Sequence, residues 1–572
     1  MSGEPDQKPP APGTVIDALL REAERGGADA LKAARQAAAL AESFAPTRTR
    51  AALQLAARLD PLDARIRLAL ARLDAEDGDL AAAHKAAEAV LADAVDQGAR
   101  ARAAFILGEL ARVEGDRPAA RGHYETAQRI EDKLLSATPN DATAARWYAR
   151  ARGRLAELDA HAGDLSRART GAEGALALLR ASAAQVGEQP VLAADIADAE
   201  MRLAALELDF NEPASARRRL AEAIGRYEAL AITETDEPHW RAVLSDAWAL
   251  AAEADYLRGA PAEARAAIDK ALQARIKLAT QRADERWALA GTWRVRAALL
   301  AALDDNKGAA DSLEQARILA ERIAGSEATL RFLVHTLLDQ ADHALRSGAL
   351  ETARRAAEDA RTRAEAIAQL KDAPPDWFGE TGACWDRLGE AARLAQDVRA
   401  ALDAFSRAAE FRRLACEAAP SNARFVRGLA AALLKLGDAA LAAGQNESAR
   451  AALMESARHR LELFEAAPQD LRAAMALAAA LERLGLAATA MGDVSAARAA
   501  WEDELALADR IFAEDDLEGL RFRAIVESHL VGLSGVDAEH YRAAALQRFD
   551  VLAKAGALSE REAALRKRLW GG

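Results

Sequence analysis

The sequence predicts an all-α protein in which similar helix pairs follow one another along the chain. Ala, Leu, Arg and Glu dominate the composition, and these residues lose little side-chain freedom in a helix. Glycine and proline are scarce: the 34 glycines and 16 prolines make up under 9 % of the 572 residues. An average domain contains about 12 % of the two together. Alanines also recur at an almost constant interval, which is typical of a stacked helical repeat.

A column of alanines defines the repeat. Its members are Ala83, Ala120, Ala168, Ala216, Ala264, Ala309, Ala353, Ala401, Ala449 and Ala497. Most consecutive members are 48 residues apart, but the first interval is 37 and the intervals that end at Ala309 and Ala353 are 45 and 44. We call these alanines the anchors.

A tight turn is expected five residues before each anchor. The residues there are Gly78, Gly115, Gly163, Asn211, Gly259, Asp304, Gly348, Gln396, Gly444 and Gly492. All but Gln396 are of types that tolerate positive φ where a helix ends. The next position is Asp in six units, which suits the start of a second helix: Asp79, Asp116, Asp164, Asp305, Asp397 and Asp493. Pro118, Pro213 and Pro261 fit its first turn. Each unit is therefore predicted as helix A, turn, helix B.

A second column predicts where helices A and B touch. Seven residues before the turn every unit has Ala or Gly, namely Ala71, Gly108, Ala156, Ala204, Ala252, Ala297, Ala341, Gly389, Gly437 and Gly485. Small residues in register allow two helices to approach closely. Trp248, Trp293 and Trp385 stand one turn earlier on the same face, and we expect them in the core.

These spacings resemble the tetratricopeptide repeat over residues 61–516, as in Leu436-Gly437, Gly444, Ala449 and Leu453. The ordinary motif has about 34 residues, so each helix here is expected to be seven residues longer, close to two turns. HEAT and armadillo repeats, with about 40–47 residues, would not require this turn chemistry. The resemblance, to the long-repeat variety of bacterial signalling and effector proteins, implies a right-handed α-solenoid of about ten units with a concave groove.

The ends of the chain are expected to flank this array. Residues 1–13 contain four prolines and no apolar segment, which predicts a disordered tail rather than a signal peptide. Helical caps are expected over residues 14–60 and 517–572, the latter with a short basic tail, because a solenoid needs polar-faced terminal units. Trp240, Trp377 and Phe425 are expected to pack the lengthened helix turns.

Composition and motifs give no indication of catalysis. The net charge of −13 disfavours nucleic-acid or anionic-membrane binding, and no apolar run reaches the length of a membrane span. Only Cys384 and Cys416 occur, which favours a reducing cytoplasm over a disulfide framework. No P-loop and no H-E-x-x-H motif is present in the sequence. We therefore expect no enzyme and no catalytic, cofactor-binding or metal-binding residues.

Two charged columns remain as candidate surface features. By the resemblance, an acidic column on helix A lines the groove: Glu109, Glu157, Glu253, Asp342, Glu390 and Asp438, with Tyr256 as a candidate apolar anchor. A basic column follows the anchors on helix B, on the expected convex side: Arg121, Arg169, Arg217, Arg265, Arg354, Arg450 and Arg498. The acids could select a partner with basic residues, or acids and arginines of neighbouring units could simply pair with one another.

The leading hypothesis is a non-catalytic scaffold that holds a protein or peptide partner in the concave groove. The alternative is a sensor or regulatory subunit of a separately encoded effector enzyme, or of a transcriptional or signalling complex, whose sequence would have the same features. An enzyme in its own right has no supporting motif. End-to-end self-assembly is a further hypothesis.

Overall fold

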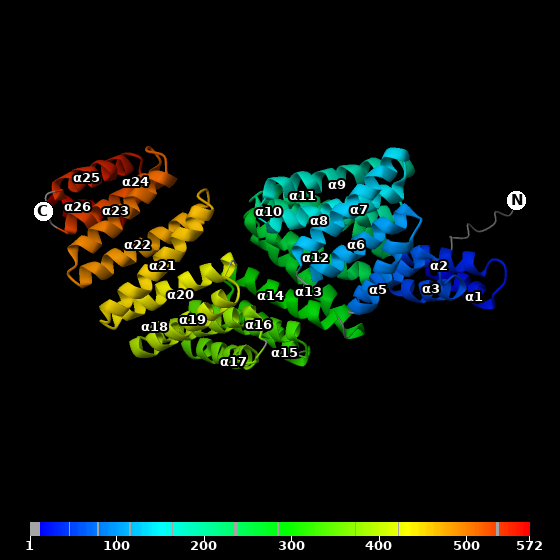
Figure 1. Cartoon of the computed structure of the whole chain (residues 1–572), viewed down its shortest axis with the longest axis horizontal. Helices are drawn as coiled ribbons and strands as arrows, with labels where there is room; N and C mark the ends of the chain where they lie inside the picture. The colour runs from blue at the N-terminus through cyan, green and yellow to red at the C-terminus, as the bar shows by residue number, and fades with distance from the viewer. Residues whose placement is uncertain are drawn as a thin grey trace. The chain divides into compact units, whose positions relative to one another are not determined.

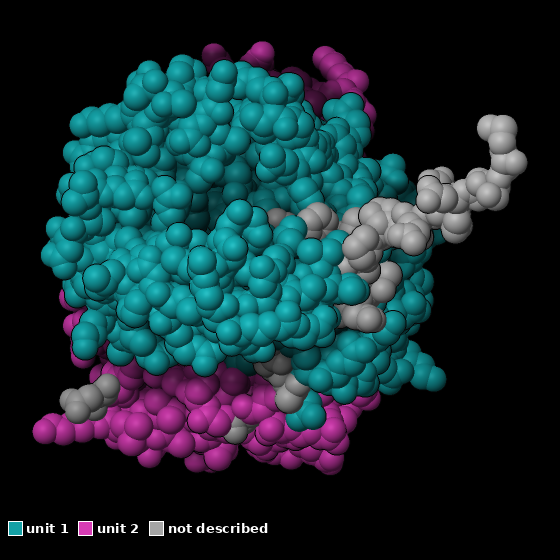
Figure 2. Space-filling view, turned by 90° about the vertical axis from the view of Figure 1, so that its right-hand side faces the viewer, with its two compact units in different colours: residues 1–312 teal, residues 313–572 magenta. Residues whose placement is uncertain are grey.

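The computed structural model describes residues 12–44, 46–76, 79–113, 116–162, 164–233, 238–282, 285–323, 325–371, 373–420, 422–533 and 537–571. It contains 26 α-helices, and the described residues include no β-strand. The chain divides into two compact units, residues 1–312 and 313–572, which Figure 2 colours separately. The all-α class is confirmed, while the expected tail over residues 1–11 lies outside the described residues.

Unit 1 is a run of antiparallel helices (Figure 1). They are α1 (Pro12–Arg25), α2 (Ala30–Phe44), α3 (Pro46–Leu59), α4 (Ala64–Glu76), α5 (Leu80–Asp93), α6 (Gln97–Val113), α7 (Arg117–Ala137), α8 (Ala142–His161), α9 (Leu165–Val186), α10 (Pro190–Asp209), α11 (Pro213–Thr233), α12 (Pro238–Leu257), α13 (Pro261–Gln281) and α14 (Arg286–Ala302). Helix α1 begins at Pro12, so Pro12 and Gly13, which the sequence places in the tail, are helical. Proline is compatible with a first helical turn.

Unit 2 continues the same pattern after α15 (Asn306–Ile323), which carries the boundary between the units. Its helices are α16 (Glu327–Arg346), α17 (Leu350–Ala368), α18 (Pro375–Leu394), α19 (Val398–Ala418), α20 (Ala423–Ala442), α21 (Asn446–Ala466), α22 (Leu471–Ala490), α23 (Val494–Ile511), α24 (Leu517–Gly532), α25 (Ala538–Lys554) and α26 (Glu560–Gly571). Every small site of the sequence pattern falls on an even-numbered helix, and every anchor on the odd-numbered helix that follows.

Each helix packs against the next, from α1 to α14 in unit 1 and from α16 to α26 in unit 2. The even-numbered helices of the array also contact the next even-numbered helix, from α4 to α14 and from α16 to α22. Within each unit, helices A therefore lie closer together than helices B and form the inner side of the curve. This is the stacking of an α-solenoid.

The turn residues adopt the left-handed conformation that their column predicts. Positive φ is found at Asn211, Gly259, Asp304, Gly348, Gln396, Gly444 and Gly492, whereas Gly78, Gly115 and Gly163 lie outside the described residues. Gln396, the exception in the sequence column, has φ 62° like the others. The position therefore imposes the conformation whatever residue occupies it, at a cost of about 1–2 kcal/mol for a residue with a Cβ.

The six aspartates that follow the turns cap helix B as predicted. Each carboxylate accepts a backbone N–H three residues later, at 2.9–3.1 Å. Pro118 lies in the first turn of α7, and Pro213 and Pro261 begin α11 and α13. These bonds satisfy donors that a helix start otherwise leaves unpaired.

The small sites are small because a side chain of helix B lies directly over them. A Cβ atom added to Gly389 would lie 2.5 Å from Cε1 of Phe405, and one added to Gly437 would lie 2.5 Å from Cγ of Leu453. Both contacts join residues 16 apart in the chain. Glycine thus removes the one atom that would force the two helices of a pair apart.

The tryptophans of the sequence pattern divide into two groups. Trp240 and Trp377 are 3 % and 0 % exposed, and these two side chains pack the lengthened turns as predicted. Trp248, Trp293 and Trp385 are half-buried, and Trp248 and Trp385 pack against the buried core clusters at their edge. Nε1 of Trp385 donates to Glu365 at 2.9 Å, and Arg361 lies over its ring.

The boundary between the units coincides with the irregular part of the repeat. The intervals of 45 and 44 residues flank Ala309, and the units divide between residues 312 and 313. Shortening a repeat changes how one helix pair stacks on the next. The shortened repeat interval is therefore the sequence feature that coincides with the boundary between the two units.

Helix α22 alone among the described helices is long and apolar enough, by length and composition, to cross a membrane. Its apolar window is 44 % buried inside the protein, because α22 packs between α21 and α23. Nine of the twenty residues of α22 are alanine, and the core helix of a protein passes the same test.

We expect the Gln396→Gly variant to be more stable than the parent by about 1 kcal/mol, because glycine adopts positive φ without a steric cost. Thermal unfolding followed by circular dichroism measures the change. Ala395→Gly is the matched control, since φ there is −76° and glycine should destabilise the chain. Equal effects at both positions would contradict the explanation.

The Gly389→Ala variant should lose about 1–3 kcal/mol of stability, since the new methyl group overlaps the Phe405 ring. Gly225→Ala is its control, because a Cβ at Gly225 meets nothing within 4 Å and alanine favours the helix. Chemical denaturation of both variants tests this contact, and a stable Gly389→Ala protein would exclude it.

Candidate binding cavity

The acidic column of helix A is part of an intramolecular ladder, which we call the inner ladder. Five of its acids are each bound by a basic residue that lies 45 positions later, on the next even-numbered helix. The pairs are Glu109–Arg154, Glu157–Arg202, Asp342–Arg387, Glu390–Lys435 and Asp438–Arg483, at 2.7, 2.9, 2.8, 3.3 and 3.2 Å. Each acid therefore ties its own helix A to the following one.

The other two candidate residues of the groove lie on α12 outside this ladder. Glu253 is exposed, and the residue 45 positions later is Ala298, which carries no charge. Tyr256 is 37 % exposed. The proposed role of all seven residues in binding a partner stays a prediction.

The basic column of helix B forms an outer ladder with different acids. Arg121, Arg169, Arg217 and Arg265 bind the carboxylates of Asp159, Glu212, Asp255 and Asp305, at 2.6, 2.8, 3.0 and 2.7 Å. Those acids lie at or near the turn of the following unit. Arg450 and Arg498 reach Asp493 and Asp537 in the same way at 3.8 and 3.5 Å. Arg354 differs, since it pairs within α17 with Glu351 and Glu358.

Acids and basic residues of neighbouring units therefore do pair within the chain. The acidic column and the basic column, however, do not pair with each other. An exposed ion pair contributes only about 0–1 kcal/mol. The carboxylate of Glu109 has three partners, because Arg154, the Tyr124 hydroxyl and Arg112 all bind it. Burial raises the pKa of Glu109, but these three partners outweigh it and hold the pKa below its ordinary value.

Unit 1 encloses a cavity of about 890 Å³ on its inner side, the size range of ligand sites. Helix α2 contacts α10 and α3 contacts α12, so the N-terminal helices meet the far side of the curve. Figure 2 shows the resulting hollow in unit 1. We call it the inner cavity.

Charged and aromatic side chains line most of the inner cavity. Its cations are Arg50, Arg72, Arg112, Arg150, Arg154, Arg202 and Arg282, and its carboxylates are Glu42, Glu109, Asp195 and Asp198. Its aromatic residues are Phe105, Tyr227, His239 and Trp240. Arginines thus outnumber acids by seven to four, in a chain whose net charge is −13.

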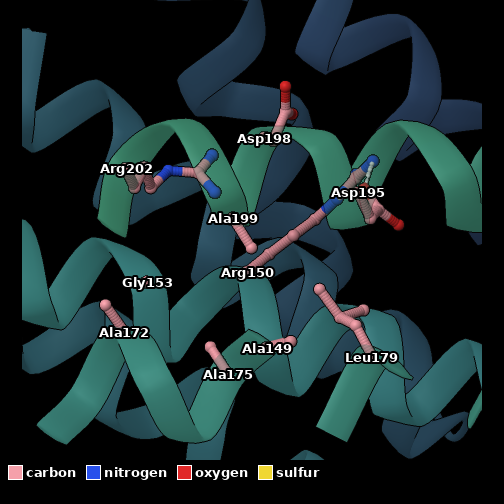
Figure 3. Close-up of a pocket in the computed structure, with 10 residues that line it drawn as sticks. All are labelled: Ala149, Arg150, Gly153, Ala172, Ala175, Leu179, Asp195, Asp198, Ala199 and Arg202. Carbon is pink, nitrogen blue, oxygen red and sulfur yellow. Dashed lines mark hydrogen bonds and ion pairs between the residues drawn. The ribbon is translucent and has the colours of Figure 1, made fainter. Parts of the chain in front are cut away.

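Arg150, Asp195, Asp198 and Arg202 line both the inner cavity and a small neighbouring void among alanine and glycine residues (Figure 3). Arg150 of α8 extends toward Asp195 of α10 and binds it at 2.8 Å, and Arg146 binds the same carboxylate at 2.5 Å. Behind them lies a void of about 10 Å³, lined in part by Ala172 and Ala175. Burial raises the pKa of Asp195, but the two guanidinium groups outweigh it and hold the pKa below its ordinary value.

Glu42 contributes a negative charge where the N-terminal helices approach the far side of unit 1. It lies on α2 and binds Arg72 of α4 at 3.4 Å. Burial raises the pKa of Glu42, whereas Arg72, Arg150 and Arg146 lower it, and the net effect is a lowered pKa. An ionised Glu42 therefore stabilises the approach of the N-terminal helices to α8.

Some buried polar groups on the cavity wall have no hydrogen-bond partner among the residues that the structure describes. Among them are the Thr49 hydroxyl and Nε1 of Trp240, in side chains that are 4 % and 3 % exposed. Buried polar atoms are nearly always bonded. Trp240 can only donate through this atom, so an acceptor from a bound molecule would complete it.

No group of three His, Cys, Asp or Glu side chains is placed to hold a metal ion within the part of the chain that the structure describes. Cys384 and Cys416 are free thiols. The chemistry that the cavity offers is hydrogen-bond donation and positive charge.

The sequence analysis missed the cavity arginines for two different reasons. Arg154 and Arg202 follow Glu109 and Glu157 at a constant spacing of 45, so the inner ladder was detectable as a second basic column. The arginines at 50, 72 and 150 come together only because unit 1 curves back on itself, and no local pattern encodes that curvature.

No protein-family model matches the chain, and no curated protein matches it. Among solved structures it is similar to BtubC (BKLC) from P. vanneervenii, with a TM-score of 0.35 and 16 % identity over 42 % of this chain and 89 % of that one. It is also similar to the apo form of RapI, with a TM-score of 0.43 and 11 % identity over 70 % of this chain and 98 % of that one. Neither likeness bears on the activity or partners of this chain.

The Asp195→Asn variant should lose about 3 kcal/mol of stability at pH 7, because it leaves Arg146 and Arg150 without their shared buried carboxylate. The lowered pKa means that the parent gains stability from ionised Asp195 above the unfolded pKa and loses it as the pH falls through the folded pKa. The difference between parent and variant should therefore shrink in acid. Thermal melts at neutral and acidic pH measure it.

Glu173→Gln is the matched control, since Glu173 pairs with Arg169 on the outside of unit 1 with 48 % of its side chain exposed. Its effect should stay below about 1 kcal/mol. A loss at Asp195 no larger than this would contradict the role assigned to the buried pair.

Proposed function

We propose that the protein is a non-catalytic interaction scaffold in which unit 1 binds a partner polypeptide on the inner side of its curve. The observation that carries this proposal is the inner cavity of about 890 Å³, lined chiefly by helices A. An open stack of helix pairs offers side chains from many successive helices to one extended ligand. Phe105, Tyr227 and Val243 supply apolar and aromatic contact area beside the charged groups, which is the mixture that binding surfaces use.

The proposal includes the finer features that the resemblance implies. We propose that the units are lengthened tetratricopeptide repeats, about ten in number, in a right-handed superhelix. Helices of 20 and 21 residues at α20 and α21 support the lengthened form. The turn residues with positive φ and the close small-site contacts support the same assignment.

A photoreactive amino acid in place of Val113 tests the proposal. Val113 lines the inner cavity and is 58 % exposed, so it should cross-link a bound polypeptide in the producing cells. Ala214, exposed on α11 and not among the lining residues, is the control position. We expect a set of cross-linked polypeptides from position 113 that position 214 does not give.

A second variant shows whether that set depends on the cavity. Ala194 lines it and is half-buried, so Ala194→Trp should fill part of the space and remove the cross-links from position 113. Cross-links that persist in this variant, or that are the same at both positions, would exclude the inner cavity as the binding surface.

A further inference from the structure

The inner cavity has a surplus of hydrogen-bond donors. Each guanidinium carries five N–H groups, while a carboxylate offers two oxygens. The lining holds seven of the former and four of the latter. Acids just outside the lining, Asp74 and Glu157, also bind its arginines.

Two lining arginines show how donors are left over. Arg202 binds Glu157 through Nε at 2.9 Å, and Arg112 binds Glu109 through one terminal nitrogen at 3.0 Å. Figure 3 shows the Arg202 guanidinium extending from α10 near Ala199. Each guanidinium has an edge beyond these bonds, and such an edge binds a carboxylate or phosphate with two parallel bonds.

Trp240 provides a further hydrogen-bond donor, independent of the arginines. Its Nε1 donor is buried and unpartnered, and it lies on the cavity wall with Tyr227 and His239 close by. A carboxylate or phosphate oxygen is the acceptor that would satisfy it. An ammonium or guanidinium group would instead bring further donors to a surface already rich in them.

We infer that the inner cavity of unit 1 binds a ligand that carries oxyanion groups, carboxylates or phosphates, and that Arg112, Arg202 and the Nε1 donor of Trp240 contribute hydrogen bonds to it. This inference rests on the proposed function for the cavity as a binding site and specifies the chemistry of its ligand. It differs from the basic partner that the acidic column suggests, because in unit 1 Glu109 and Glu157 are already bound by arginines. The oxyanion comes either from an acidic segment of a polypeptide or from a free polyanion.

Binding measurements on the full chain test the inference with three probes: a glutamate-rich peptide, a lysine-rich peptide and inorganic tripolyphosphate. At least one anionic probe should bind, with an affinity that falls as salt is added. Arg112→Gln combined with Arg202→Gln should weaken it about tenfold or more, and Trp240→Phe should weaken it severalfold while keeping a ring in place. Arg112→Lys combined with Arg202→Lys should restore part of the affinity.

Arg169→Gln combined with Arg265→Gln is the matched control. These arginines each bind one carboxylate of the following unit on the outer ladder, so their loss should leave anion binding unchanged. Circular dichroism melts show whether each variant is folded. Equal weakening by the inner and outer variants would overturn the inference.

The probes also separate this inference from the proposed function. Binding of the lysine-rich peptide alone would overturn the oxyanion site and leave a polypeptide scaffold. Binding of tripolyphosphate alone would support the oxyanion site and overturn the polypeptide function. Binding of the glutamate-rich peptide supports both, and no binding of any probe overturns both.

Discussion

The close approach of helix A to helix B is the constraint on which the rest of this structure depends. Where the small site is Gly389 or Gly437, the side chain of Phe405 or Leu453 occupies the space that a Cβ would take. At other units alanine meets alanine, as in Ala156 and Ala172, which are both buried. The pairs differ in composition, but in each one a small residue of helix A faces helix B. Close packing within each pair is what allows one pair to stack on the next.

Curvature and charge are linked through the same helices. Helices A contact each other along the inner side of the curve. The charged side chains on their exposed face therefore lie around a concave space, where the electric fields of several side chains add. The inner ladder neutralises the acids that the sequence displays most regularly. What remains is the arginine excess of the inner cavity. The acidic column alone suggests an acidic surface, whereas the lining of the inner cavity contains more arginines than acids.

Local chemistry was predictable from the sequence and long-range geometry was not. The turns, the aspartate caps and the small sites depend on neighbours within one helix pair. The turns and small sites recur in all ten units and the aspartates in six, which makes them visible in a single sequence. Even Gln396 conforms, because the helix pair imposes its φ. The contact of α2 with α10 joins segments about 150 residues apart and depends on small rotations summed over several units. The cavity and its arginines follow from that sum.

The two ion-pair ladders link successive helix pairs of the solenoid by contacts that depend on salt. Each ion pair of a ladder joins one helix pair to the next, on the inner or the outer edge. Partly exposed ion pairs weaken when mobile ions screen them over about 8 Å at physiological strength, whereas the alanine contacts between helices do not respond to salt. Added salt is therefore expected to weaken the links between successive helix pairs more than the apolar packing between their helices.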